Sequence, residues 1–277
     1  MPFQQNVAFP VGPLALAIGN DILDHSVNDY DAIAPMFDEI MGIDFHAATH
    51  HLRQEVAATV ARGSSLACLD LCCGTGLFFD LLAGRFDLVG TGLDRSAGQI
   101  GMARNRPARS QCSYAVGDIR QTVFPSGVDL VTINFDALNH LGSRADWRNV
   151  IRRAHEALRE GGALLLDVNL PDRLLHDWNA PEVIAKPEVV YIQLARPAVL
   201  EKEGVRRQTP VIMFKHDGDG RFSRYGMLIE QFAIPLDELC AMISESGFSD
   251  IQILQDASPL PMGHIFNKHR AFVSARR

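Results

Sequence analysis

Short apolar runs alternate with amphipathic segments through the middle of this 277-residue chain. Each run is rich in apolar or β-branched residues and is short enough for one strand, and the segments between them have apolar residues at helical spacing. The expected strands span 65–72, 87–93, 112–116, 129–134 and 163–168, and the expected helices span 77–83, 97–105 and 145–158. Strands that alternate with helices are typical of a parallel sheet with crossover helices. The sequence therefore predicts an α/β fold with a doubly wound, mostly parallel sheet.

The last part of the chain adds elements to this sheet. Pro235 opens a helix with apolar residues on one face, and Gly247 ends it. The runs 251–254 and 271–274 then read as two more strands, which we expect to form an antiparallel hairpin at the sheet edge. The expected sheet thus has seven strands. Gly161-Gly162 is expected to stop the helix 145–158.

Two regions do not follow this alternation. The segment 1–62 has helical patterns, with one helix interrupted near Pro35 and a second over 50–62, and is expected to form a cap. The segment 187–234 contains three strand-like runs and the turn sequence DGDG, and is expected to form inserted strands over the sheet. We interpret residues 1–277 as one domain, with a cap at 1–62, a cofactor-binding core at 63–186, inserted strands at 187–234 and a final helix and strand pair at 235–277.

Charge and hydropathy limit the partners. The chain has 26 Lys and Arg against 33 Asp and Glu, a net charge of −7, and has no dense basic block. Because proteins that bind nucleic acids neutralise many phosphates with Lys and Arg, DNA and RNA are disfavoured. The apolar run 11–18 is short, is broken by Gly12 and Pro13 and lacks a basic leader, which argues against a signal peptide or a membrane span. We expect a cytoplasmic protein, and the sequence does not specify its oligomeric state.

Cysteine and histidine spacing gives no sign of a metal site. The five cysteines are an odd number without a C-x-x-C pair, which favours neither disulfides nor zinc. His46, His50 and His51 cluster in the first region, but a helical cluster without a nearby acidic partner is more often a solvated surface. We expect no metal.

The sequence LDLCCGTGLF joins the first expected strand to the first helix. The strand ends near Leu71, a glycine turn follows, and a helix begins at Leu77. A dinucleotide fingerprint needs a third glycine where Phe79 stands, and the carboxylate of Asp70 would repel a pyrophosphate. A nicotinamide cofactor is therefore disfavoured. The carboxylate suits a ligand that brings a positive charge and hydroxyl groups.

This turn resembles the first motif of the class I S-adenosylmethionine-dependent methyltransferases, small-molecule branch. That motif has an acidic residue, a small residue and two glycines at alternate positions, and Asp70, Cys72, Gly74 and Gly76 match it. The likeness covers about residues 65–170. It implies a Rossmann-like methyltransferase fold, S-adenosylmethionine as cofactor, and contact of the turn with the methionine moiety.

Later residues fall in the order of the same family. The resemblance implies that Asp94 binds the ribose hydroxyls, Asp118 the adenine amino group, and Ile119 the adenine ring. Helix capping is the alternative for Asp94, and a plain turn residue for Asp118. Tyr30 matches a cap aromatic that approaches the cofactor, although packing is equally open to it and to Phe37. The full set of expected cofactor contacts is Tyr30, Asp70, Leu71, Cys72, Gly74, Gly76, Asp94, Arg95, Asp118, Ile119, Asn134 and Phe135.

The segment NFDALNHL after the fourth expected strand is where the acceptor is expected to bind. By the resemblance, Asn134 and Phe135 border the transferred methyl group, and Asp136, Asn139 and His140 face the acceptor. The Asn/Asp-Pro-Pro-Tyr pattern of methyltransferases acting on adenine or glutamine nitrogen is absent, so we expect a small-molecule acceptor.

His140 is the candidate base, because an imidazole titrates near neutral pH, although it also suits capping or packing. The predicted reaction is methyl transfer to oxygen or nitrogen by in-line displacement. The alternatives are another reaction that uses the sulfonium, such as a decarboxylation or rearrangement, and a non-catalytic binding protein on the same fold.

Overall fold

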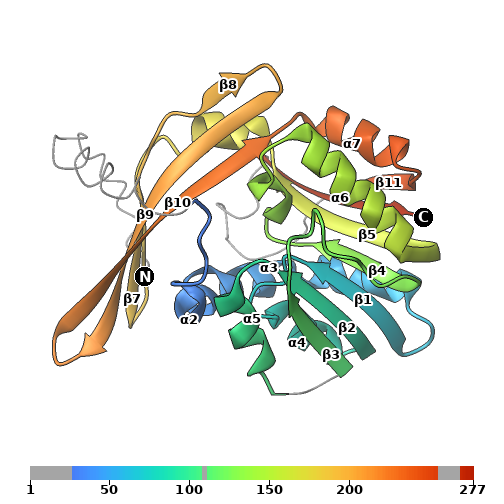
Figure 1. Ribbon diagram of the computed structural model, residues 1–277, viewed down its shortest axis with the longest axis horizontal. Coiled ribbons are helices and arrows are strands. Elements are labelled where there is room, and N and C mark those ends of the chain that lie inside the picture. The colour runs from blue at the N-terminus through green and yellow to red at the C-terminus, as the bar shows by residue number, and fades with distance from the viewer. Residues whose placement is uncertain (1–26, 108–110, 255–268) are drawn as a thin grey trace.

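A computed structural model describes residues 27–107, 111–254 and 269–277 of the chain, and Figure 1 shows their arrangement. Seven strands form a central sheet in the order β11-β12-β5-β4-β1-β2-β3. Their bounds are β1 Ser65–Leu71, β2 Asp87–Asp94, β3 Gln111–Val116, β4 Val128–Ile133, β5 Leu158–Asn169, β11 Ser249–Leu254 and β12 Arg270–Arg276. The strands β3, β2, β1, β4 and β5 are parallel neighbours, and β12 is antiparallel to both β5 and β11. The predicted fold class and antiparallel hairpin are confirmed.

Helices cover both faces of this sheet (Figure 1). Their bounds are α3 Ile43–Val60, α4 Leu77–Ala83, α5 Ala97–Arg104, α6 Arg144–Ala157 and α7 Leu236–Glu245. Apolar side chains of α6 and α7 pack on Leu69, Leu71 and alternate residues of β4 and β5. Those of α3 and α4 pack on Leu66, Cys68 and the opposite set of strand residues. Because neighbouring residues of a strand point to opposite faces, β1 is buried on both sides, as a central parallel strand is expected to be.

The end of α6 differs from its prediction. The helix ends at Ala157, and the strand β5 starts at the next residue and runs through Gly161 and Gly162. The register between β4 and β5 shifts in this stretch, and Gly161 has φ +72°. The glycine pair therefore forms an irregularity inside a strand and does not stop the helix, because the left-handed conformation that glycine allows also serves a β-bulge.

The predicted cap forms one helical run in its described part, where we had expected two helices. The helix α2 (Ala34–Phe37), the π-helical turn η1 (Asp38–Gly42) and α3 follow one another directly. Pro35 lies in the first turn of α2, where its missing N–H breaks no helical hydrogen bond, so it begins the run and does not interrupt it.

The inserted strands form a second sheet, which is antiparallel, in the order β10-β9-β7-β6, with β8 paired to β9. Their bounds are β6 Glu182–Ala185, β7 Val189–Gln193, β8 Val199–Glu201, β9 Gly204–Gly218 and β10 Arg221–Ala233. The turn after β9 holds Asp219 and Gly220 at φ 51° and 71°, as a two-residue hairpin loop requires. Because β6 already belongs to this sheet, the insertion begins before the predicted boundary at residue 187.

The second sheet stands beside the central sheet, and the helical run connects the two (Figure 1). Side chains of α2 and η1, including Met36 and Ile40, pack on Tyr191, Met213 and Met227 of the second sheet. The last turns of α3 pack on the central sheet. The gap between the sheets is therefore closed from one side by the cap. None of the helices in the described residues is long and apolar enough to span a membrane.

Candidate active site

A cavity of about 350 Å³ lies between the ends of β1, β2 and β4, the helical run and one face of the second sheet. It opens where the strand order of the central sheet reverses, on either side of β1, which is the usual ligand position in doubly wound sheets. Predicted site residues from five separate segments of the chain meet there. Those that line it are Tyr30, Asp70, Cys72, Gly74, Asp94, Arg95, Asp118, Ile119, Asn134, Phe135 and His140.

Two predicted contacts, Leu71 and Gly76, do not line the cavity. The side chain of Leu71 is fully buried in the core on the face that α6 covers. Gly76 precedes α4 with φ +76°, and a Cβ there would lie 2.8 Å from the Tyr114 hydroxyl oxygen. Leu71 therefore serves core packing and Gly76 a tight turn, and a cofactor contact by either residue stays a prediction.

Asp70 is the last residue but one of β1 and is linked to β4 and the residue that follows it. Its Oδ1 accepts hydrogen bonds from Thr132 Oγ1 at 2.6 Å and from Asn134 Nδ2 at 2.9 Å. Arg53 of α3 donates from Nε to Asn134 Oδ1 at 2.6 Å. Despite these bonds, burial raises the pKa of Asp70 to about 7. Asp70 thus orients Asn134 at the cavity wall.

Asp94 joins the glycine turn to the start of α5. Its carboxylate accepts from the backbone N–H groups of Gly74 at 2.9 Å and Ser96 at 2.8 Å. The cap of α5 is Ser96, whose Oγ accepts from Gln99 N. The capping role that we considered for Asp94 therefore belongs to Ser96. Burial raises the pKa of the Asp94 carboxyl. Asp94 also lines the cavity.

Asp118 follows β3 and is paired with Arg120. The guanidinium and the backbone N–H of Arg120 both donate to the Asp118 carboxylate. The side-chain hydrogen bond from Arg120 lowers the pKa of Asp118, so this group is ionised at neutral pH. The neighbouring Ile119 is buried and offers an apolar surface to the same part of the cavity.

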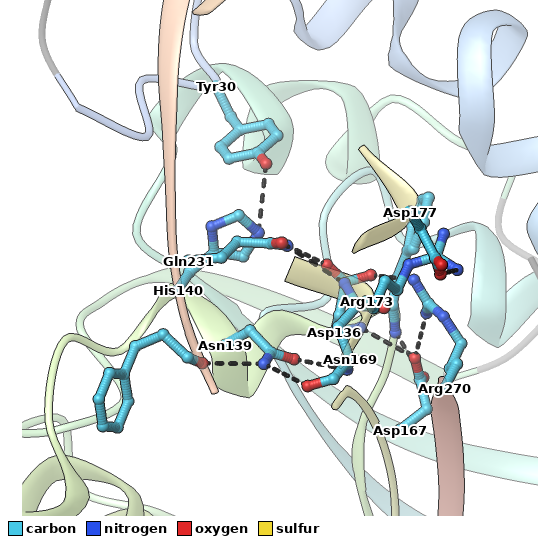
Figure 2. Close-up of polar contacts among 12 residues, drawn as sticks. Tyr30, Asp136, Asn139, His140, Asp167, Asn169, Arg173, Asp177, Gln231 and Arg270 are labelled. Carbon is cyan, nitrogen blue, oxygen red and sulfur yellow. Dashed lines mark hydrogen bonds and ion pairs between the residues drawn. The ribbon is translucent and has the colours of Figure 1, made fainter. Parts of the chain in front are cut away.

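The turn after β4 is held by buried charges. Phe135 and Asp136 have φ +59° and +46°, a conformation that non-glycine residues rarely adopt. Their N–H groups donate to the carboxylate of Asp167 at 2.7 and 2.9 Å. Arg270 contacts Asp136 at 2.5 Å and Asp167 at 2.5 Å (Figure 2). Asp167 and Arg270 were not identified from the sequence, although an aspartate inside the apolar run LLLDVN was a visible signal for Asp167.

His140 and Asn139 have different environments, although both were expected to face the acceptor. The Tyr30 hydroxyl lies 3.4 Å from His140 Nε2, and both residues line the cavity (Figure 2). Burial lowers the pKa of His140 and raises that of Tyr30, so both are neutral at pH 7. Asn139 is fully buried and donates to the carbonyl oxygens of Asn169 and Phe232, each at 2.9 Å. It joins β5 to β10 and does not line the cavity.

A sequence model of a protein family described as a methyltransferase domain matches residues 68–162. The ends of β1, β2, β3 and β4 lie in this range. Residues 68–162 thus match a methyltransferase domain, and the chain has the fold of the class I methyltransferases. A protein of Geobacillus sp. that is named as a methyltransferase is 27% identical over 82% of this chain and 92% of its own. The fold matches an S-adenosylmethionine-dependent methyltransferase from Clostridium acetobutylicum with TM-score 0.70 and 19% identity, over 89% of this chain and 98% of that one. It matches a sugar N-methyltransferase from Streptoalloteichus sp. with TM-score 0.67 and 17% identity, over 100% and 98%. The predicted enzyme class is confirmed.

The second sheet supplies one wall of the cavity of this methyltransferase. Alternate residues of four strands face it: Glu182, Ile184, Tyr191, Gln193, Thr209, Ile229 and Gln231. Gln231 donates from Nε2 to Asp136, which ties this wall to the turn after β4 (Figure 2). None of these residues was identified from the sequence, because only strand pairing brings them onto one face.

His46 also belongs to the site of this methyltransferase, contrary to the expectation of a solvated cluster. Its ring is buried against Phe45 and Phe78 and lines the cavity. Burial, aided by the positive charge of Arg53, holds the pKa of His46 well below its ordinary value. His46 is therefore a neutral polar group at the cavity wall, beside Phe78 of α4.

Proposed function

We propose that this methyltransferase transfers the methyl group of S-adenosylmethionine to a nitrogen or oxygen of a small molecule bound between its two sheets. The observation that carries the proposal is that Asp70, Asp94 and Asp118, which lie at or just after the ends of three different strands, line one cavity. Carboxylates at successive strand ends favour a ligand with a positive charge and hydroxyl groups over one with phosphates. A sulfonium nucleoside has both features.

The cofactor half of the cavity fits such a ligand. A Cβ added to Gly74 would meet only Gln99 Oε1, at 3.8 Å, so the backbone of the turn is open to close approach. Among the residues that the structure describes, Gln99 Oε1 and His46 Nδ1 are buried without a hydrogen-bond partner. In this proposal Asp94 accepts hydrogen bonds from the ribose hydroxyls and Asp118 from the adenine amino group. When bound, S-adenosylmethionine supplies a methyl group on a positively charged sulfur.

The acceptor half places a neutral imidazole opposite that group. Because burial lowers the pKa of His140, its ring is unprotonated at pH 7 and able to accept a proton from a hydroxyl or an ammonium group. Tyr30 positions the ring through the contact at 3.4 Å. The walls of the cavity hold the acceptor in line, and orientation of this kind accounts for about 7 to 11 kcal/mol of barrier in well-aligned systems.

Three observations support the proposal that the acceptor is a small molecule. The cavity has the size of small-molecule sites, the chain has a net charge of −7, and its sequence has no basic block for a nucleic acid. The sugar N-methyltransferase of similar fold has a small-molecule acceptor by its name. The cytoplasmic location stays a prediction from the sequence.

Calorimetric titration with S-adenosylhomocysteine tests the cofactor site. The parent protein is expected to bind, and Asp94→Ala to bind at least about tenfold more weakly, because one lost charge-assisted hydrogen bond is worth about 1.5 to 3 kcal/mol. Asp87→Ala is the matched control, since Asp87 lies at the opposite end of the same strand and is exposed. No binding by the parent would remove the proposal, and unchanged affinity of Asp94→Ala would remove the ribose role.

Methyl transfer itself is tested with a labelled methyl donor and an extract of metabolites. The expected result is label in a small molecule and one S-adenosylhomocysteine per product. Consumption of the donor without a methylated product would favour the alternative, in which a bound sulfonium assists a decarboxylation or rearrangement.

A further inference from the structure

Arg173 presents buried donors in the acceptor half of the cavity. It begins the π-helical turn η3 (Arg173–Asp177) after β5, is 6% exposed and lines the cavity. Within the described residues, its Nε and Nη1 have no hydrogen-bond partner. Its ion pair with Asp177 spans 3.9 Å, which is too long for a hydrogen bond. Buried guanidinium donors are rarely left unmet, so this group calls for an explanation.

The segment that carries Arg173 is fixed in place. Arg207 of β9 donates from Nη1 to the carbonyl oxygen of Leu174 at 2.6 Å and from Nη2 to that of Trp178. The backbone N–H of Arg173 donates to the Leu170 carbonyl oxygen at 3.0 Å. The guanidinium carbon of Arg173 lies 5.0 Å from the centre of the Trp178 ring. The Arg173 side chain is therefore packed in position, as a preorganised binding group is.

The acidic groups around Arg173 are already engaged by other donors. The Asp177 carboxylate lies 2.9 Å from His269 Nδ1. The Asp136 carboxylate accepts hydrogen bonds from Arg270 and Gln231 (Figure 2). Glu182 is the remaining acid that acts on Arg173, and it lines the same cavity. Burial lowers the pKa of Arg173 to about 10, so it carries its charge at pH 7.

A second donor, on the second sheet, lines the same cavity. Gln193 of β7 accepts from the Tyr191 hydroxyl through Oε1 at 3.1 Å, which fixes the orientation of its amide. Its Nε2 is buried and has no hydrogen-bond partner in the described part of the chain. The acceptor half thus offers hydrogen-bond donors from η3 and from the second sheet, and a ligand rich in acceptor oxygens satisfies them.

We propose that the methyl acceptor carries an oxyanion, either a carboxylate or a phosphate, that binds the guanidinium of Arg173. The inference rests on the proposed function, because it assigns the acceptor half of the same cavity. Charge-assisted hydrogen bonds to a guanidinium are about twice as strong as neutral ones, and a buried donor rejects a ligand that cannot pair with it. The oxyanion holds one end of the acceptor and leaves the nucleophile free to face His140.

The test uses pairs of fragments, one anionic and one neutral on the same ring, added to protein saturated with S-adenosylhomocysteine. Benzoate is compared with benzamide, and phenyl phosphate with phenol, by calorimetry or ligand-observed NMR. We expect at least one anion to bind about tenfold more tightly than its neutral partner, and the tighter anion to distinguish a carboxylate from a phosphate. Neutral fragments that bind as well as the anions, or no binding of either anion up to its solubility, overturn the inference.

Substitutions at Arg173 and Glu182 test whether Arg173 causes the preference for the anionic fragment. Arg173→Gln is expected to abolish the preference for the anion, and Arg173→Lys to retain part of it, because lysine keeps the charge without the planar donors. Glu182→Gln is the matched control: it removes a charge from the same cavity and should leave anion binding equal or tighter. Loss of the preference in Glu182→Gln, or its persistence in Arg173→Gln, overturns the inference.

Binding of S-adenosylhomocysteine separates this inference from the proposed function. Each variant is expected to keep the parent affinity for it, which also reports folding. If Arg173→Gln does not fold, the parent fragment pairs and Arg173→Lys decide the matter. A parent protein that binds no S-adenosylhomocysteine contradicts the proposed function. A parent that binds it but shows no preference for anions contradicts only the assignment of Arg173.

Discussion

The hydroxyl of Tyr30 lies 3.4 Å from Nε2 of His140, although the two residues are 110 positions apart. Their rings meet edge to face with centres 5.7 Å apart. A residue of the cap thus touches the candidate base on the turn after β4. The position of the cap and the orientation of the His140 ring are therefore linked by this contact.

Loss of that hydroxyl is expected to affect turnover more than cofactor binding. In Tyr30→Phe, we expect kcat to fall about tenfold, because a misplaced base weakens proton transfer, which contributes about 10²- to 10⁴-fold in all. The affinity for S-adenosylhomocysteine should change less than threefold. Tyr225→Phe is the control, since Tyr225 belongs to the second sheet but does not line the cavity. Equal loss of affinity and kcat in Tyr30→Phe would instead assign Tyr30 to the cofactor.

The activity of the parent should depend on pH through His140. Because burial lowers its pKa, the ring is neutral above that value and gains a proton as the pH falls through it. We expect kcat to be constant near neutral pH. It should decrease at pH values below the ordinary pKa range of histidine. His140→Gln should lower kcat about 10²-fold or more and remove this acid limb. His216→Gln, at a half-exposed position in the second sheet, should do neither. An acid limb that persists in His140→Gln contradicts the role.

Stability should depend on pH through Asp70. The folded-state pKa of about 7 is above the ordinary value of 3.8, so between these values the folded protein binds a proton that the unfolded chain has lost. The free energy of unfolding therefore falls as pH rises through this window, by at most about 1.4 kcal/mol per pH unit from this group.

Asp70→Asn should remove that slope. Both hydrogen bonds reach Oδ1 of Asp70, and the amide oxygen of asparagine is able to accept them. Urea unfolding of parent and variant at pH 5 and pH 8 measures the difference. We expect the variant to gain stability relative to the parent at pH 8. A difference that is the same at both pH values would show that Asp70 does not titrate in this range.

The two glycines of the first turn should respond differently to substitution. Both have positive φ, so alanine costs about 1 to 2 kcal/mol at either position. In Gly76→Ala the new Cβ also meets Tyr114 at 2.8 Å, and we expect a further loss of about 1 to 3 kcal/mol of stability. Gly74→Ala has room but intrudes on the cofactor half, so its main effect should be weaker binding of S-adenosylhomocysteine. Urea unfolding and calorimetry separate the two effects. Equal losses of stability in both variants would contradict this distinction.

The sequence by itself determined the central sheet and the half of the site that belongs to strand ends. Asp70, Gly74 and Asp94 could be placed because a strand, a turn and a helix are local patterns, and because parallel strands end at one edge. The same local patterns also pointed to Leu71, whose side chain packs under α6, and to Gly76, where Tyr114 of a later strand leaves no room for a Cβ.

The tertiary structure alone decided the acceptor half. Asn139 joins two strands that lie far apart in the chain, and His46 is buried because the helical run packs on α4. Arg173 and Gln193 share a cavity only because the second sheet stands beside the central one. Register and packing between distant segments depend on the summed contacts of many residues, so no short stretch of sequence contains them.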